Sequence, residues 1–489
     1  MRRSGILLHI TSLPSGEGIG TMGQEAFRFV DMLKEAGFTV WQVLPIGPTG
    51  YGESPYQSGS TYAGNPLMID LTLLRNQGLL AESDLVSLPE SDRIDFEQVK
   101  QLKNRALRAS FRYGWKKVST QVHDFLDRTT WLKDYSLYAA LKEHFELRSW
   151  MTWPEDIRHR RPEAMEAWKK TLRDEIDYQC YLQYLFDMQW RALKEYANNA
   201  GVSLMGDIPI YVAEDSADTW AHPENFQFDA DLHPTRVAGV PPDYFCEDGQ
   251  LWGNPLYNWR YLHFHRFAWW MDRLENASQK YDILRIDHFI GFANYYSIPY
   301  GSKNARVGKW VNAPGKALFR RVKKELPDLE IVAEDLGVVS ARVKKLLESC
   351  GFPGMRVLQF AFGGDDSNQH LPANCSENIA YYTGTHDNDT SRGYWERIPK
   401  QEKENARKVL GSVSDEEAVA AMIRTVFSAA PALAVVPMQD LLDLDNKARM
   451  NYPGTLGGNW LWRMTHEDMN YICGKAPLLR KLLKGCDRI

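Results

Sequence analysis

The sequence contains no long apolar run and few cysteines. None of its 489 residues lies in a stretch approaching the roughly 20 apolar residues that a membrane-spanning helix requires. The apolar run behind the basic N-terminus extends only from Ile6 to Leu8, which is too short for a secretory signal peptide. There are only six cysteines, and no two form a C-x-x-C pair. These absences predict a cytoplasmic protein with reduced thiols and no membrane contact.

An excess of positive charge is also missing. The formal net charge is -5, with 58 lysines and arginines against 63 aspartates and glutamates, whereas nonspecific nucleic-acid binding needs clustered basic residues. Neither a Walker loop nor an H-E-x-x-H motif occurs. His263 and His265 lack the carboxylate or thiolate company that a metal site requires. We therefore expect no nucleic-acid partner and no metal or nucleotide cofactor.

One glycine motif imitates a dinucleotide-binding fingerprint. The segment Gly18–Gly23 reads G-x-G-x-x-G between an expected strand and an expected helix. That strand is expected to end near Thr11, so the glycines do not lie in the turn that directly follows it. The next expected strand ends in the run Leu44–Pro48, which holds no acidic residue for a ribose hydroxyl. The motif therefore does not support a cofactor-dependent oxidoreductase.

The composition is that of an ordinary globular protein, with 44% hydrophobic and 25% charged residues. Eight apolar runs rich in β-branched residues recur along the chain, each followed by a helical pattern. These runs are Gly5–Thr11, Thr39–Ile46, Ser203–Tyr211, Asp282–Phe289, Glu330–Asp335, Met355–Phe362, Asn378–Thr385 and Leu433–Gln439. A doubly wound open sheet would also alternate in this way. Eight units of this size favour a closed (β/α)8 barrel, forming one catalytic domain over residues 1–489.

Two connections between the runs are too long for simple loops. Residues 48–201 separate the second run from the third, and their second half is dense in helix-forming and charged residues. We expect a mostly helical subdomain inserted in a βα loop, on the face where barrels keep their active sites. Residues 220–259, rich in Pro, Gly, Asp and aromatics, are expected to form an ordered loop that covers the substrate. After residue 451 we expect a closing loop and helix, and no C-terminal β-sandwich domain.

Three of the expected strands end in carboxylates. Asp287 closes the fourth, Glu334 the fifth and Asp387 the seventh. Each alone could be a salt-bridged strand end or a helix N-cap, which is the fate expected for Asp335 and Asp389. In a barrel, however, the first three would converge on the carboxyl face of the sheet. Three converging carboxylates are what acid-catalysed cleavage of a glycosidic bond needs.

Two basic side chains accompany these acids. Side chains alternate along a strand, so Arg285 and Asp287 project to the same side, and the guanidinium favours the ionised carboxylate. His386 directly precedes Asp387. Both Arg285 and His386 are therefore candidates for binding sugar hydroxyls.

Motifs spread over nearly the whole chain resemble those of the amylomaltases and disproportionating enzymes. These are the 4-α-glucanotransferases of glycoside hydrolase family 77, in the α-amylase clan. The matching segments are Leu8–Ser15, Ser54–Gln57, Gly206–Val212, Trp252–Tyr257, Leu284–Phe289, Ala333–Gly337, Gly384–Thr390 and Asn451–Thr455. The resemblance implies a retaining transferase that acts on maltooligosaccharides and other α-glucans and needs no cofactor.

The resemblance also implies a role for each matching residue. Asp287 would be the nucleophile, Glu334 the general acid and then the base, and Asp387 the group that stabilises the transition state through the 2- and 3-hydroxyls. Tyr56 would stack under the sugar. The remaining implied substrate contacts are Asp207, Trp252, Arg285, His288, His386, Asn451, Tyr244 and Phe245, of which Trp252 and the Tyr244–Phe245 pair would grip the glucan and help to exclude water.

Two other functions stay open on the residues alone. A hydrolase of the same clan would use the same three carboxylates and differ only in whether water or a sugar takes the intermediate. A glucan-binding protein without catalysis is the other alternative, and the complete set Asp287, Glu334 and Asp387 argues against it.

Overall fold

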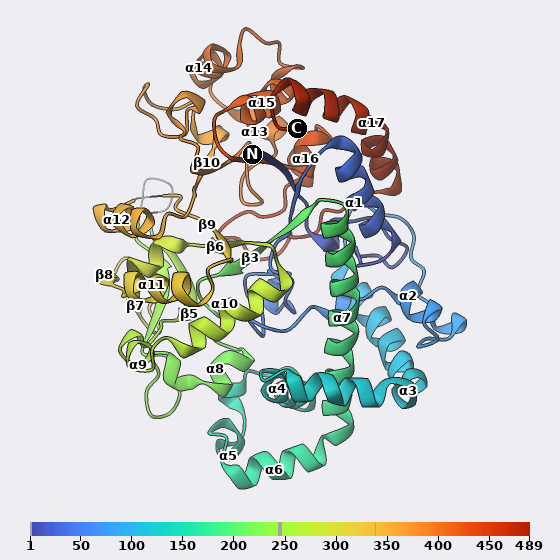
Figure 1. The fold of residues 1–489 in the computed structure, drawn as a ribbon. Helices are drawn as coiled ribbons and strands as arrows, with labels where there is room; N and C mark the ends of the chain where they lie inside the picture. The colour runs from blue at the N-terminus through green and yellow to red at the C-terminus, as the bar shows by residue number, and fades with distance from the viewer. Residues whose placement is uncertain (1, 243–246, 338) are drawn as a thin grey trace.

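A computed structural model describes residues 2–242, 247–337 and 339–489 (Figure 1). Eight of the strands in these residues are parallel and form one sheet. The order in the sheet is β10-β11-β12-β1-β2-β3-β6-β9. The strands are β1 Arg3–Leu7, β2 Val40–Gln42, β3 Ser203–Pro209, β6 Ile283–Asp287, β9 Glu330–Ala333, β10 Gly354–Val357, β11 Ile379–Tyr382 and β12 Leu433–Pro437. β9 and β10 approach each other, and the Ala333 amide donates to the Pro353 carbonyl at 2.9 Å. Each predicted run supplies one strand in chain order, which confirms the (β/α)8 barrel.

Several strands are shorter than the apolar runs that predicted them. β1 ends at Leu7 rather than Thr11, β10 at Val357 rather than Phe362, and β11 at Tyr382 rather than Thr385. The apolar pattern continues past the strand because the following loops are themselves buried, as at Ile10. The hydrophobic pattern of a sequence indicates which residues are buried, but it does not indicate where the backbone hydrogen bonds of a strand end.

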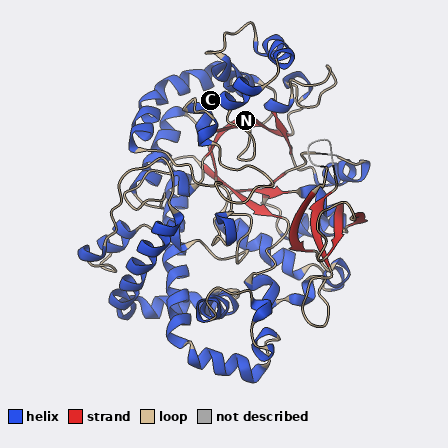
Figure 2. Ribbon diagram, turned by 180° about the vertical axis from the view of Figure 1, so that it is seen from behind, coloured by secondary structure: helices blue, strands red, loops and turns tan. Residues whose placement is uncertain are grey.

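Most barrel strands are separated by helices that cover the outside of the sheet (Figure 2). Between β10 and β11, where a helix was also predicted, the chain instead forms only two short 3-10 turns, Leu358–Phe360 and Pro372–Asn374. Helix α1 illustrates why the helices form: its apolar residues Phe29, Val30, Leu33 and Ala36 are all fully buried. The helix ends at Gly37, whose left-handed φ of 89° suits the residue after a helix. The bounds of this group are α1 Gln24–Ala36, α9 Trp259–Phe264, α10 Ala268–Lys280, α11 Gly315–Glu325, α12 Ala341–Cys350, α13 Ser391–Arg397, α14 Lys400–Leu410, α15 Ala418–Ser428, α16 Met438–Leu441 and α17 His466–Gly485. As predicted, the segment after residue 451 forms a loop and a helix, α17.

The long connection between β2 and β3 is mostly helical. Its helices are α2 Leu71–Asn76, α3 Phe96–Arg128, α4 Leu132–His144, α5 Glu155–Arg158, α6 Pro162–Thr171 and α7 Arg173–Asn199. α3 and α4 pack against α7, which also contacts α1 and leads directly into β3. The end of α7 that leads into β3 therefore packs against the barrel. That residues 48–201 form a separate subdomain stays a prediction.

A second, antiparallel sheet lies beside the barrel (Figure 2) and was not predicted from the sequence. It contains β4 Arg236–Val240, β5 Gln250–Pro255, β7 Asn294–Pro299 and β8 Lys309–Asn312, in the order β5-β4-β7-β8. The first two strands come from the loop after β3, which also holds α8 Ala217–Ala221, and the last two from the loop after β6. Within each loop the two strands pair with each other, and β4 and β7 join the two pairs across the loops. The sheet is therefore completed only by residues that lie beyond the segment 220–259.

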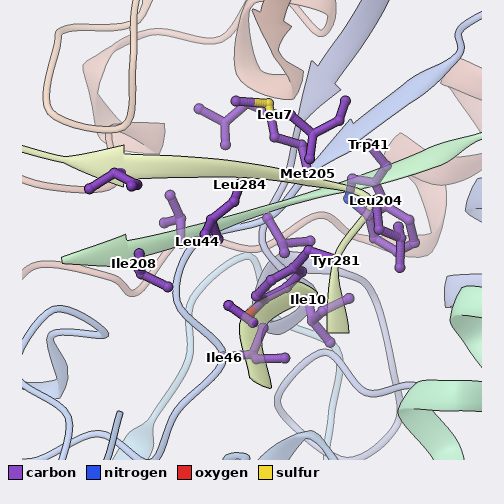
Figure 3. Close-up of a cluster of buried hydrophobic side chains, with 14 of the residues drawn as sticks. Leu7, Ile10, Trp41, Leu44, Ile46, Leu204, Met205, Ile208, Tyr281 and Leu284 are labelled. Carbon is purple, nitrogen blue, oxygen red and sulfur yellow. The ribbon is translucent and has the colours of Figure 1, made fainter. Parts of the chain in front are cut away.

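Apolar side chains from neighbouring strands pack together in one buried cluster (Figure 3). Leu7, Trp41, Leu204, Met205 and Leu284 are all buried there. Strands of a parallel barrel are covered on both faces, which accounts for their nearly continuous apolar sequences. The packed core leaves the polar side chains at the carboxyl ends of the strands as the chemically distinctive part of the barrel.

Candidate active site

A buried arginine joins two carboxylates at the carboxyl ends of β3 and β6. Asp207 and Arg285 are direct partners in the pairing of these strands. The guanidinium of Arg285 contacts Asp207 Oδ2 at 2.6 Å through Nη1 and Asp287 Oδ1 at 2.9 Å through Nη2. Burial raises the pKa of Asp207, and the positive charge of Arg285 opposes that shift. The contact of Arg285 with Asp287 was predicted from the sequence and is present in the structure.

Glu334 follows β9 and lies against the residue after Asp287. Its Oε2 accepts the His288 amide at 2.7 Å and its Oε1 accepts the Leu336 amide at 2.6 Å. Burial raises the pKa of Glu334 to about 8; the negative charge of Asp287 adds to the shift, and Arg285 opposes it. This carboxyl therefore holds its proton at neutral pH and is able to donate it.

Asp387 is held from two sides in the loop after β11. The amide of Asn451 donates to Asp387 Oδ1 at 2.6 Å, and Nε2 of His386 lies 3.4 Å from the same oxygen. The backbone of Asn451 also donates to the His386 carbonyl at 3.1 Å. The side chain of Asp387 is 44% exposed, so it can still reach a ligand from solvent.

Tyr56 connects these two groups of residues. It comes from the loop after β2, and its hydroxyl donates to Asp207 Oδ2 at 2.8 Å. Its ring stacks on His386, with ring centres 5.1 Å apart and planes inclined by 17°. One oxygen of Asp207, Oδ1, has no hydrogen-bond partner among the described residues. That Asp207 binds a sugar hydroxyl stays a prediction, and this oxygen is the one left for it.

Trp252 comes from the second sheet and packs on His288. The two ring centres are 4.8 Å apart, with the planes at 88°. His288 adopts a left-handed backbone with φ of 50°, which turns the chain sharply after Asp287. Burial lowers the pKa of His288 to about 4, so the imidazole is neutral at pH 7. The loop after β3 thus reaches the side chains at the end of β6.

The predicted site residues form one connected set. Contacts run from Asn451 through Asp387, His386, Tyr56, Asp207 and Arg285 to Asp287, and from Glu334 through His288 to Trp252. Tyr244 and Phe245 lie outside the described residues. Asp335 pairs with Arg356 at 3.1 Å, and Asp389 pairs with Arg397 and Arg449, as expected for structural acids.

Two further residues contact the site and were not predicted to do so. The ring of Trp460 lies 5.9 Å from that of Tyr56 and 5.9 Å from that of His386. His9 is buried in the same region, and burial together with the positive charge of His386 lowers its pKa to about 3. His9 lies in the segment Leu8–Ser15, which is one of those that carry the family resemblance, so the sequence could have indicated it. Nothing in the residues around Trp460 indicates a contact with a tyrosine so far away in the chain.

The glycine motif that imitates a dinucleotide fingerprint has a packing role. A Cβ on Gly20 would lie 1.9 Å from the Ile10 carbonyl, and one on Gly23 would meet the Asp70 carboxylate at the same distance. These glycines therefore allow the chain to approach itself closely.

Within residues 2–242, 247–337 and 339–489, no cluster of three or more His, Cys, Asp or Glu could hold a metal ion. In the same part of the chain, no helix combines the length and apolarity needed to cross a membrane.

The arrangement combines a protonated carboxyl with a neighbouring carboxylate that is paired to arginine. Such a pair can protonate a leaving oxygen while the carboxylate attacks the carbon from which it departs. Asp387, Tyr56 and His386 provide a polar and aromatic surface beside that pair, which is suited to a ring carrying several hydroxyls.

Comparison with known proteins identifies close relatives. A family model described as 4-alpha-glucanotransferase matches residues 8–469. A 4-alpha-glucanotransferase of Clostridium butyricum is 45% identical over 98% of this chain and 100% of its own length. A chloroplastic or amyloplastic 4-alpha-glucanotransferase of Arabidopsis thaliana is 42% identical over 100% of this chain and 86% of its own length. The structure of the Streptococcus agalactiae amylomaltase in complex with acarbose is similar over 100% of both chains, with a TM-score of 0.97 and 39% identity.

Proposed function

The chain belongs to the 4-alpha-glucanotransferase family, glycoside hydrolase family 77, and from this premise we propose how its active site works. The protein is a transferase that acts on α-glucans. It cleaves an α-1,4 bond of a maltooligosaccharide, releases the reducing-end piece, and passes the retained glucosyl segment to the 4-hydroxyl of another glucan. The mechanism is a double displacement that retains the configuration at the anomeric carbon.

The observation that carries this mechanism is the different surroundings of two neighbouring carboxyls: Glu334 is buried, and Asp287 is paired with Arg285. In the first step, Glu334 donates its proton to the glycosidic oxygen, and Asp287 forms a bond to the anomeric carbon as the bond to the leaving sugar breaks. The raised pKa of Glu334 supports the first role, and the ion pair from Asp287 to Arg285 supports the second.

The second step reverses the first with a different sugar. Glu334, now ionised, accepts the proton from the 4-hydroxyl of the acceptor, whose oxygen attacks the anomeric carbon and displaces Asp287. The number of glycosidic bonds is unchanged, and Glu334 regains its proton for the next cycle.

The remaining site residues bind the sugar in this proposal. Asp387 accepts hydrogen bonds from the 2- and 3-hydroxyls, and the contacts from Asn451 and His386 support this role because they orient its carboxylate. Tyr56 and Trp252 provide aromatic surface for the sugar rings. We also propose that residues 220–259, which carry Trp252, cover the bound glucan, and that residues 48–201 form an inserted helical subdomain.

Incubation of the pure protein with maltotriose alone tests the activity. We expect a ladder of longer glucans together with glucose and little net gain in reducing ends, because transfer conserves glycosidic bonds. A stoichiometric increase in reducing ends without longer products would instead assign the protein to the hydrolases. No change in maltotriose at all would favour a glucan-binding protein without catalysis.

A cytoplasmic location is part of the same proposal. All cysteines that the structure describes have free thiols, namely Cys180, Cys350, Cys375, Cys473 and Cys486. Reduced thiols are typical of a reducing compartment. Fractionation of the producing cells should recover the transferase activity with the cytoplasmic contents, and recovery from another compartment would contradict this assignment.

A further inference from the structure

Trp460 has a backbone conformation that is unusual for a bulky residue. Its φ is 65°, in the left-handed region that residues other than glycine and asparagine rarely adopt. The side chain is only 5% exposed. A residue held in such a conformation is strained and persists only where its surroundings determine it, often near functional sites. The contacts of Trp460 show what determines it here.

The indole of Trp460 packs on two proposed sugar-binding residues at once. Its plane is inclined by 41° to the ring of Tyr56 and by 37° to that of His386, each with ring centres 5.9 Å apart. Tyr56 and His386 are themselves stacked at 5.1 Å. The three rings come from three separate loops, so each ring limits the movement of the other two.

Trp460 also closes the loop that carries Asn451. Its backbone amide donates to the Met450 carbonyl at 2.7 Å, which joins the two ends of residues 451–459 in the manner of an Ω-loop. Inside this loop, Asn459 Oδ1 accepts the Tyr452 amide at 3.0 Å. Residues 452–458 are exposed, whereas Trp460 is buried against Tyr56 and His386. The indole is thus the anchor of a loop whose first residue binds Asp387.

We propose that Trp460 is a positioning residue for sugar binding. It touches no reacting atom; it holds Tyr56 and His386 in their stacked arrangement and fixes the loop that delivers Asn451 to Asp387. This inference rests on the proposed function, in which Tyr56 and His386 contact the sugar. Displacement of positioning groups by about 1 Å can lower turnover about a hundredfold, so the loss of this ring should be visible in the kinetics.

A double-mutant cycle between Trp460→Leu and Tyr56→Ala tests the proposal, with kcat and KM measured for a maltotriosyl fluoride donor so that weak variants can be followed. We expect Trp460→Leu to lower kcat/KM at least about tenfold in the native protein and by a clearly smaller factor in the Tyr56→Ala background, where only its contacts with His386 and with the loop that carries Asn451 are left to lose. A loss of equal size in both backgrounds, or no loss in the native protein, would overturn the proposal.

Two further variants separate positioning from simple destabilisation. Trp395→Leu removes another buried indole, that of Trp395 in α13. This indole donates a hydrogen bond to Asp415 at 3.0 Å and lies outside the set of site residues. Trp395→Leu should lower the unfolding temperature as Trp460→Leu does and leave kcat/KM within about twofold. Trp460→Phe keeps an aromatic ring and should stay within about threefold of native kcat/KM. If Trp460→Leu does not fold, the cycle is made with Trp460→Phe, and an equal effect of that change in the native and Tyr56→Ala backgrounds would overturn the proposal.

The same set of variants distinguishes this inference from the function on which it rests. Native kcat/KM in Tyr56→Ala would contradict the sugar-binding role of Tyr56 itself. A strong loss in Tyr56→Ala combined with native kinetics in Trp460→Leu would leave that role intact and refute only the role of Trp460.

Discussion

The two walls of the active site are built in different ways. We define the strand wall as Asp207, Arg285, Asp287 and Glu334, which lie at the ends of the neighbouring strands β3, β6 and β9. The loop wall is Tyr56, His386, Asp387, Asn451 and Trp460, which come from three loops. The side chain of Asp207 in the strand wall is completely buried, whereas that of Asp387 in the loop wall is 44% exposed. The two walls meet where the Tyr56 hydroxyl donates to Asp207.

This contrast assigns different physical tasks to the two walls. Backbone pairing sets the positions in the strand wall, as in the direct partnership of Asp207 with Arg285, and low solvent access strengthens its charges. Side-chain contacts between loops set the positions in the loop wall. We therefore expect changes in the strand wall to affect both chemistry and stability, and changes at the solvent-accessible Asp387 and Asn451 of the loop wall to affect sugar binding with little loss of stability.

The largest expected effect lies inside the strand wall. Asp287→Asn removes the nucleophile and should lower kcat for every donor by about 10⁴-fold or more, as removal of a nucleophile does in other covalent mechanisms. Glu334→Gln removes only the proton donor and should be equally poor with maltotriose. A glycosyl fluoride needs little protonation, so Glu334→Gln should still react with it and accumulate the covalent intermediate.

Mass spectrometry of peptides from the Glu334→Gln protein measures that intermediate. The added sugar mass should appear on the peptide that contains Asp287. An adduct on another residue, or near-native turnover of Asp287→Asn, would show that the assignment of the two carboxyls is wrong.

The next effect is a loss of stability specific to the strand wall. Arg285→Met leaves the buried carboxylate of Asp207 without its partner, which should lower the free energy of unfolding by about 3–5 kcal/mol. Urea unfolding measures the change. Arg3→Met is the matched control, because Arg3 on β1 makes a 2.7 Å ion pair with Glu330 that is partly open to solvent. Its removal should change the free energy by no more than about 1 kcal/mol, and equal losses would contradict the contrast between buried and exposed pairs.

A smaller effect is expected in the loop wall. Asn451→Ala removes the hydrogen bond that orients Asp387 and should lower kcat/KM about tenfold, which corresponds to about 1.4 kcal/mol of transition-state stabilisation. Because Asp387 remains hydrated, the free energy of unfolding should change by less than about 0.5 kcal/mol. Kinetics with maltotriose and urea unfolding test both parts. Asn378→Ala, at an exposed position remote from the site, is the control and should alter neither quantity.

The smallest expected difference concerns pH. Glu334 must be protonated for the first step, so kcat/KM should fall as pH rises through about 8, the value to which burial and Asp287 raise its pKa. Asn451→Ala should leave this alkaline limb in place, because the loop wall does not touch Glu334. A limb near the usual pKa of a glutamate would show that the carboxyl is hydrated in solution.

The sign of the linked stability change follows from the same pKa. Between about 4.5 and 8 the folded protein keeps a proton on Glu334 that the unfolded chain has lost, so this group makes the free energy of unfolding fall as pH rises across that window. Glu334→Gln should remove this contribution. Urea unfolding of the native and Glu334→Gln proteins at several pH values measures the difference.

Much of the strand wall could be predicted because it depends on short-range patterns. The apolar runs indicated where strands would form, and their polar ends indicated Asp287 and Glu334. Alternation along a single strand predicted the contact between Arg285 and Asp287, which is present at 2.9 Å. The pairing of Arg285 with Asp207 was not predicted, because it depends on the register between two strands that are far apart in the chain.

The loop wall could be predicted only as separate residues. The polar end of the seventh expected strand pointed to His386 and Asp387, and the family resemblance added Tyr56 and Asn451. Neither indicated the stack of Tyr56 on His386 or the indole of Trp460 behind it. The second sheet was missed for a related reason. Its strands β4 and β7 pair with each other although they belong to loops that follow different barrel strands.

The sequence by itself determined the eight-unit barrel, the acids at its strand ends and the placement of arginine beside the nucleophile. These features depend on hydrophobic periodicity and side-chain alternation, which are properties of consecutive residues. The tertiary structure alone decided the burial that raises the pKa of Glu334, the bridge from Arg285 to Asp207, and the meeting of three rings around Tyr56. Each of these depends on segments that come together only when the strands close into a barrel, because burial and contact distance are set by the whole packed chain and not by any local stretch of it.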